Sequence, residues 1–142
     1  MVTTSDIQPE LIQAYMETEF RVMEESTFTL HIGEVNSDLI DAHKRHRVEC
    51  SAFVTACNPF SQELTNEANL EKQRMLAKEL TSRSLEFVSG IGQHPSNKWP
   101  GEPSYLVFGL TLEASKVLGA RLEQNAIVWS SSDGIPQLIL LR

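Results

Sequence analysis

The segment that most constrains the fold is residues 51–57, SAFVTAC, because its side chains are apolar or small on both faces. Such a strand is typical of the centre of a sheet that is covered on both sides. Residues 27–32, TFTLHI, alternate apolar and polar side chains instead, which predicts a strand with one buried face. The chain is therefore expected to fold as a sheet with helices packed against it.

The remaining elements follow from helical spacing, capping residues and turn signals. We expect helices over residues 9–18, 38–47, 67–82 and 112–123. We expect strands over residues 19–23, 27–32, 51–57, 85–89, 104–109, 126–130 and 137–141. The order αββαβαββαββ predicts an α+β or α/β fold with a single mixed β-sheet and packed helices. A chain of 142 residues is expected to form a single domain, residues 1–142.

The charge balance restricts the partners of the chain. Its 19 acidic and 12 basic residues give a net charge of −7, which argues against general nucleic acid binding, since neutralising phosphates needs a basic surface. The basic run HKRHR at residues 43–47 is a local exception, but its three cations would repel a metal ion, so no metal site is predicted. No apolar run has the length of a membrane span, and the N-terminal residues lack the features of a secretory signal. We therefore expect a cytoplasmic protein that does not contact a membrane.

Residues 89–104, SGIGQHPSNKWPGEPS, are predicted to form a long loop between two apolar strands. Loops longer than about 12 residues with no structure of their own are usually functional or disordered. This one carries the aromatic residue Trp99 and the carboxylate of Glu102. Its Gly90-Ile91-Gly92 lacks a following helix, and the chain has no HExxH, CxxC or GxSxG motif, so no cofactor is expected.

Four polar segments are expected to converge at one edge of the sheet. A crossover helix between the strands at 51–57 and 85–89 predicts that they run parallel, and the helix before residue 126 predicts a second parallel pairing. Asn58, Glu102 and Asn125 would then share one edge. Open α/β sheets bind ligands outside the carboxyl ends of their strands, so this edge is the predicted site.

The predicted site binds a small polar ligand, because amides and hydroxyls recognise hydrogen-bonding groups and an aromatic ring can stack on a planar one. A nucleotide-like or nucleoside-like molecule is one candidate. If there is catalysis, Glu102 is the preferred base and His94 the second choice, whereas Ser61 is a poor nucleophile without an evident base. The expected ligand-binding residues are Asn58, Ser61, Asn69, Trp99, Ser104, Gln124 and Asn125.

Each of these residues also has a structural interpretation. Asn58 suits a turn after a strand, Gln124 and Asn125 suit the end of a helix, and Glu102 suits a solvated loop. The alternative function is therefore a non-catalytic protein-interaction or regulatory module, in which the loop contacts a protein partner. Ligand-dependent stabilisation distinguishes the two classes.

Three segments, CNPFSQELTNEAN, GIGQHPSNKWPGEPSYLVFGL and LEQNAIVWSSSDGIPQL, resemble a bacterial family of uncharacterised proteins, domain of unknown function 3293. The resemblance extends over most of the chain and implies a fold relationship without an established activity. The matching positions are Asn58, Pro59, Ser61, Gly90, Gly92, Trp99, Glu102, Ser104, Gln124, Asn125, Ala126 and Trp129. The chain departs from the family pattern at Cys57, where a larger aromatic residue is expected, and at Ser84, where a glycine is expected.

Overall fold

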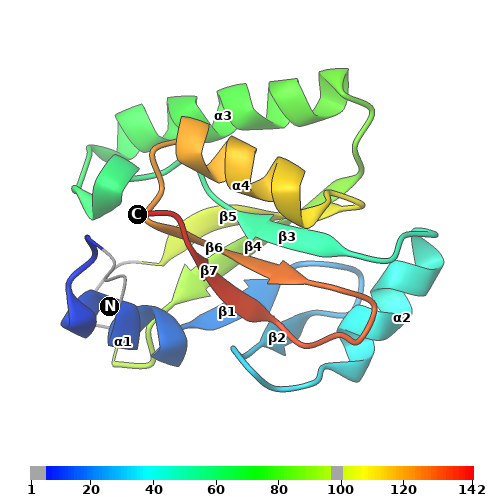
Figure 1. Ribbon diagram of the computed structural model, residues 1–142. Coiled ribbons are helices and arrows are strands. Elements are labelled where there is room, and N and C mark those ends of the chain that lie inside the picture. Colours follow the sequence, from blue (N-terminus) through cyan, green and yellow to red (C-terminus); the bar gives the residue numbers. More distant parts are fainter. Residues whose placement is uncertain (1–5, 97–100) are drawn as a thin grey trace.

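The computed structural model describes residues 6–96 and 101–142 (Figure 1). Its helices are α1 Pro9–Glu17, α2 Ser37–Arg45, α3 Asn66–Ser82 and α4 Leu112–Arg121, with a short 3-10 helix, η1, at Pro59–Ser61. Its strands are β1 Glu19–Val22, β2 Phe28–Leu30, β3 Ser51–Val54, β4 Phe87–Gln93, β5 Glu102–Phe108, β6 Ala126–Ser130 and β7 Gln137–Leu140. Apart from η1, this is the predicted order, and the α+β fold is confirmed. The structure describes no helix that is long and apolar enough to span a bilayer.

The seven strands form one sheet in the order β2-β1-β4-β5-β3-β6-β7, and every neighbouring pair is antiparallel. The expected parallel neighbours are wrong. β3 and β4 do point in the same direction, but β5 is inserted between them; β3 separates β5 from β6 in the same way. The carboxyl ends of β3 and β4 therefore still lie at the same edge as the amino ends of β5 and β6.

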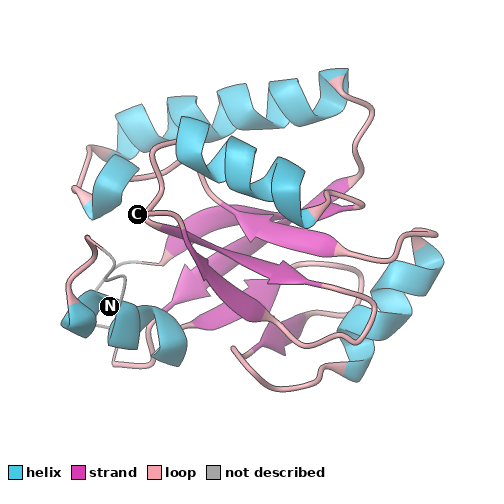
Figure 2. Ribbon diagram, in the orientation of Figure 1, coloured by secondary structure: helices cyan, strands magenta, loops and turns pink. Residues whose placement is uncertain are grey.

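The sheet curls around one core and carries helices on its other face. The enclosed core includes Phe20, Leu30, Phe53 and Phe108, and α2 contributes Leu39 to it. On the opposite face, α3 and α4 lie side by side over the sheet (Figures 1 and 2). All four residues of β3 are buried, which confirms the prediction of a central strand covered on both sides.

The curl of the sheet brings the segment after one edge strand, β2, into contact with the segment before the other, β7. The backbone N–H of Gly33, after β2, donates to the carbonyl of Pro136, before β7, over 2.8 Å. The N–H of Asn36 donates to the carbonyl of Gly134 over 2.9 Å. α1 and α2 lie at opposite ends of the curled sheet (Figure 1). The α1 end is the one where the predicted polar residues gather.

Half of the predicted loop at residues 89–104 is strand. β4 continues to Gln93 and β5 begins at Glu102, and their ladder extends to the pair Gly92↔Glu102. Glycine allows this continuation, because a Cβ on Gly90 would lie 2.7 Å from the backbone oxygen of Arg21 and 2.7 Å from the ring of Phe53. Gly90 therefore marks a close approach of β1 rather than a turn.

The segment after β3 leaves the ladder earlier than predicted, at Val54. Asn58, Phe60 and Ser61 then adopt left-handed backbone conformations, with φ of 48°, 54° and 59°. Such conformations cost non-glycine residues about 1 kcal/mol or more and concentrate at functional sites. Ser84 has φ of 58° just beyond α3, a left-handed conformation that suits the glycine expected at this position.

Candidate functional site

Glu102 and Ser104 lie on the face of β5 that also carries Leu106 and Phe108 into the enclosed core. Phe108, at the other end of the strand, stacks on His46 just beyond α2, with 3.7 Å between ring centroids. Glu102 is therefore at the end of the curled sheet away from α2. We call this end the mouth of the sheet and define it by Asn58, Ser61, Glu102, Ser104 and Asn125.

Asn58 connects three segments of the mouth. Its side-chain amide donates to Glu102 Oε2 over 2.9 Å, and its Oδ1 accepts from the backbone N–H of Leu64 over 2.9 Å. Asn69 on α3 donates from Nδ2 to the same Oδ1 over 2.7 Å and accepts the backbone N–H of Asn58 over 2.9 Å. Asn58 and Asn69 thus hold the loop and the carboxyl in place, and their amide groups are used within the protein.

A second hydrogen-bond network connects η1 with α1 and with Arg142. Asn125 Nδ2 donates to Ser61 Oγ over 3.0 Å and to the Tyr15 hydroxyl over 3.1 Å, and these two hydroxyls lie 2.6 Å apart. Arg142 donates to Asn125 Oδ1 over 3.0 Å, and its guanidinium lies over the Phe60 ring, 4.4 Å from the centroid. Ser61 and Asn125 are therefore brought together as predicted.

Gln124 and Ser104 are buried and bond to the backbone. Gln124 Nε2 donates to the carbonyls of Cys57 and Leu122, over 3.0 and 3.3 Å. Ser104 Oγ donates to the carbonyl of Glu102 over 3.0 Å. Both residues fix the positions of their neighbours, and a ligand-binding role for either stays a prediction.

Glu102 has the electrostatics of a reactive or binding carboxyl. Burial raises its pKa above the ordinary 4.5, and the hydrogen bond from Asn58 offsets this only in part. Among the described residues its Oε2 is held by Asn58, and Oε1 has no hydrogen-bond partner. Burial also raises the pKa of the nearby Cys57 thiol, with a smaller contribution from the charge of Glu102. Perturbed pKa values of this kind concentrate at functional sites, which makes Glu102 a candidate functional carboxyl.

The raised pKa of Glu102 predicts a pH dependence of stability. A carboxyl with a higher pKa in the folded state binds its proton more tightly when folded, so its contribution is full below pH 4.5 and is lost as pH rises through the folded pKa. We expect the free energy of unfolding of the wild type, relative to that of Glu102→Gln, to fall as pH rises above 4.5. Urea unfolding of both proteins across this range measures it. A relative stability that falls toward acid instead contradicts the raised pKa.

The two remaining predicted site residues are His94 and Trp99. His94 bonds to Glu17 at the end of α1, with 3.1 Å between Nε2 and Oε1, and to Ser96, with 2.7 Å between Nδ1 and Oγ. These contacts link His94 to the end of α1, and its role as an acid or base stays a prediction. Trp99 lies outside the described residues.

Sequence reasoning missed several residues of this end of the sheet. Tyr15 has only the sequence signal of a position in the helix expected over residues 9–18, and Phe60 has none except its position after Asn58-Pro59. Gln73 lies on the buried face of α3, and its Oε1 accepts the backbone N–H of Ala56 over 2.7 Å. Its Nε2 is buried without a partner among the described residues.

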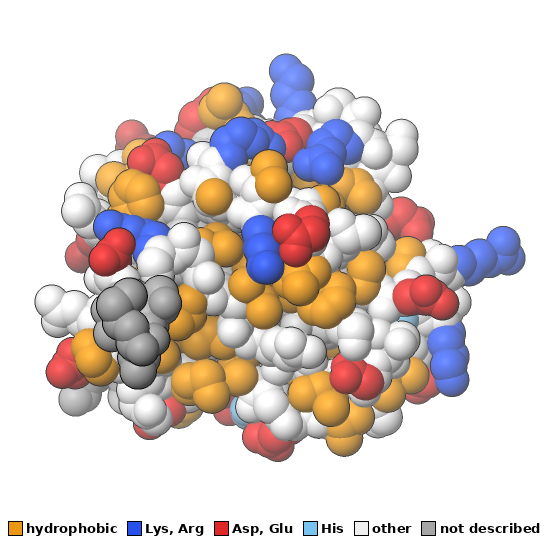
Figure 3. Space-filling view, viewed as in Figure 1, with side chains coloured by type: hydrophobic (Ala, Val, Ile, Leu, Met, Phe, Trp, Pro, Cys, Tyr) orange, Lys and Arg blue, Asp and Glu red, His pale blue; other side chains and the backbone are white. Residues whose placement is uncertain are grey.

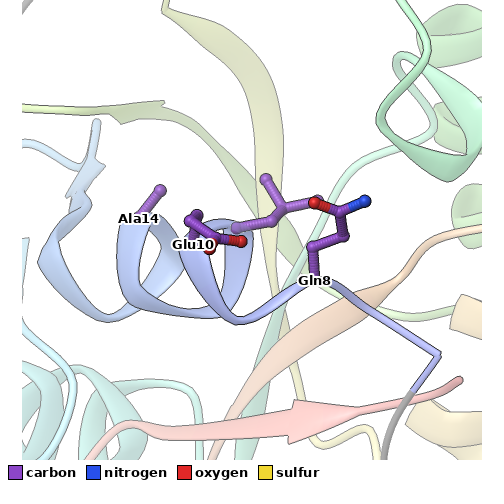
Figure 4. Close-up of a pocket in the computed structure, with 4 residues that line it drawn as sticks. Gln8, Glu10 and Ala14 are labelled. Carbon is purple, nitrogen blue, oxygen red and sulfur yellow. The ribbon is translucent and has the colours of Figure 1, made fainter.

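Two hollows are lined by described residues, and neither contains the predicted site residues. One lies beside α1, where Gln8, Glu10 and Ala14 project to the same side of the helix (Figure 4). The other lies against α3 and α4 and includes Ala56 and Glu123, which are next in sequence to Cys57 and Gln124.

Comparison with known proteins identifies a family and no activity. The model of a family described as "Protein of unknown function (DUF3293)" matches residues 54–127, which is just over half of the chain. The match contains the loop with Asn58, Glu102 on β5 and Asn125 before β6. No curated protein and no solved structure matches the chain.

Proposed function

We propose, for a chain that belongs to the family described as "Protein of unknown function (DUF3293)", that the mouth of the sheet binds a small polar molecule through Glu102. One observation carries this proposal. The Glu102 carboxyl is partly buried, its Oε2 accepts from Asn58, and its Oε1 has no hydrogen-bond partner among the described residues. Such a group can accept a hydrogen bond or take up a proton from a ligand.

The chemistry of the mouth favours a nucleoside-like ligand over a nucleotide. No Lys or Arg among the described residues forms an ion pair with Glu102, so a phosphate directly beside this carboxylate would be repelled. The cation at the mouth, Arg142, is engaged with Asn125 and the Phe60 ring instead. The amino group of a base can donate to the open oxygen. Phe60 offers a partly exposed ring that already stacks on a planar guanidinium.

Any catalysis at the mouth would use Glu102 as acid or base. Ser61 shares its hydroxyl with Tyr15 and Asn125, neither of which is a base that could activate it. In this proposal the protein acts in the bacterial cytoplasm. Its net charge of −7 argues against general nucleic acid binding, because neutralising phosphates needs a basic surface.

Thermal shift measurements with adenosine, guanosine, cytidine and uridine, and with their monophosphates, test the proposal. A ligand at about ten times its Kd stabilises by about 1.4 kcal/mol, which raises the Tm of a chain of this size by about 5 °C. We expect one nucleoside to produce such a shift in the wild type and in Glu34→Gln, which alters an exposed carboxylate elsewhere. Glu102→Gln should abolish the shift.

Two results would reject this function. A shift that persists in Glu102→Gln places the ligand elsewhere, and no shift with any of the eight compounds favours the alternative, a non-catalytic protein-interaction or regulatory module. Since Glu102→Gln keeps the shape and removes the charge, its own stability should stay within about 0.5 kcal/mol at neutral pH. A loss of several kcal/mol would make Glu102 a structural anchor.

A further inference from the structure

The two edge strands of the sheet differ in how their backbone is covered. At β2, the side-chain amide of Asn36 donates to the carbonyl of Thr29 over 2.9 Å, and the carbonyl of His31 just beyond accepts from Glu34 over 3.2 Å. β2 also has only three residues. Capped and short edges resist pairing with another strand. β2 is therefore protected.

The edge of β7 is covered only just before the strand, where the carbonyl of Pro136 accepts from the N–H of Gly33 over 2.8 Å, and Gln137–Leu140 itself has no such protection among the described residues. The N–H of Leu141 donates to Asn125 O over 2.8 Å, and β7 pairs with β6 from Leu140↔Ala126 onward. Because hydrogen-bonded pairs alternate in an antiparallel ladder, the backbone groups of Leu138 and Leu140 face away from β6. No described hydrogen bond satisfies them on that side.

The side chains of β7 do not discourage pairing either. Its sequence, QLIL, has no charge and no proline. Leu140 is 39% exposed. In the space-filling view, hydrophobic side chains gather in the middle of the face that β6 and β7 form below α4 (Figure 3). An uncharged apolar edge of this kind is the type that pairs with another strand.

We propose that β7 pairs antiparallel with β7 of a second copy of this chain, which joins the two sheets across a twofold axis. The uncharged strand meets its own copy without opposing like charges. Asp133 precedes β7 and Arg142 follows it, so antiparallel pairing places the acidic end of one strand toward the basic end of the other. Pairing of β7 with β2 would build an open chain of copies, and the cap on Thr29 opposes it.

The interface is expected to be weak and concentration-dependent, because the strand has only four residues. Sedimentation equilibrium over micromolar to millimolar protein measures it. We expect the wild type to pass from monomer to dimer, and Leu140→Lys to weaken the dimer at least tenfold, which is about 1.4 kcal/mol. The matched control is Leu70→Lys on α3, where the leucine is 72% exposed, and it should dimerise as the wild type does.

A second variant separates dimer loss from misfolding. Leu140→Pro removes an N–H that faces away from β6, so it should leave the β6 ladder and the circular dichroism spectrum intact while abolishing the dimer. A protein that stays monomeric at all concentrations overturns the proposal. Assembly beyond a dimer overturns it too, as does a dimer that Leu70→Lys disrupts and Leu140→Pro does not.

Discussion

Replacing Asn58 by alanine is expected to lower the free energy of unfolding by about 3 kcal/mol, because it removes two acceptor interactions and one donor interaction and strains the backbone. The backbone N–H of Leu64 and the amide of Asn69 lose their partner, and each such loss costs about 1 kcal/mol. Asn58 has φ of 48°, which alanine adopts at a further cost of about 1 kcal/mol. Urea unfolding with an unchanged m-value is the measurement.

Two companion variants separate these contributions. Asn58→Gly loses the same side chain but tolerates the left-handed backbone, so it should be about 1 kcal/mol more stable than Asn58→Ala. Asn66→Ala alters an exposed asparagine in the first turn of α3 and should change stability by less than about 0.5 kcal/mol. A loss for Asn58→Ala as small as that of Asn66→Ala would show that the loop is not held by this residue.

Gly90→Ala is expected to lower the free energy of unfolding by about 2 to 3 kcal/mol through overpacking. A Cβ at this position would lie 2.7 Å from the backbone oxygen of Arg21 and 2.7 Å from a ring carbon of Phe53. Neither neighbour can move without disturbing β1 or the enclosed core, because Arg21 and Gly90 belong to the ladders of β1 and β4 and Phe53 is buried.

Gly92, two residues along the same strand, is the control. A Cβ there would make ordinary contacts of 3.7 Å or longer with Phe20 and Thr18, so Gly92→Ala should be tolerated within about 0.5 kcal/mol. Thermal and urea unfolding of both variants provide the comparison. Equal losses for the two would mean that Gly90 is not set apart by the close approach of β1.

The sequence predicted the elements and the shared edge of the sheet better than the strand order. Alternation in residues 27–32 and the apolar segment 51–57 identified β2 and the buried β3, because burial acts on each strand separately. The insertion of β5 between β3 and β4 depends on pairing between distant segments, which no local pattern records. β3 and β4 run in the same direction in both the expected and the observed strand order. The prediction that their carboxyl ends share one edge therefore holds, although the expected neighbouring strands are wrong.

The sequence predicted most polar residues of the candidate site, but it did not predict the backbone geometry that positions them. Glycine and proline in residues 89–104 are typical of loops, and only the approach of β1 shows why glycine lies within a strand there. The left-handed backbone of Phe60 had no sequence signal, because glycine and asparagine are the residues that normally indicate it. Tyr15 joins Asn125 across the whole length of the chain, a contact beyond any local pattern.

The most direct test of the proposed function is an NMR titration of the wild-type protein with each of the four nucleosides. We expect one of them to shift the backbone amide signals of Asn58, Glu102 and Asn125 together, and to change the carboxyl carbon signal of Glu102. These three residues are far apart in sequence and meet only at the mouth of the sheet. Shifts confined to the hollow against α3 and α4, or no shifts with any nucleoside, would contradict the assignment of this site.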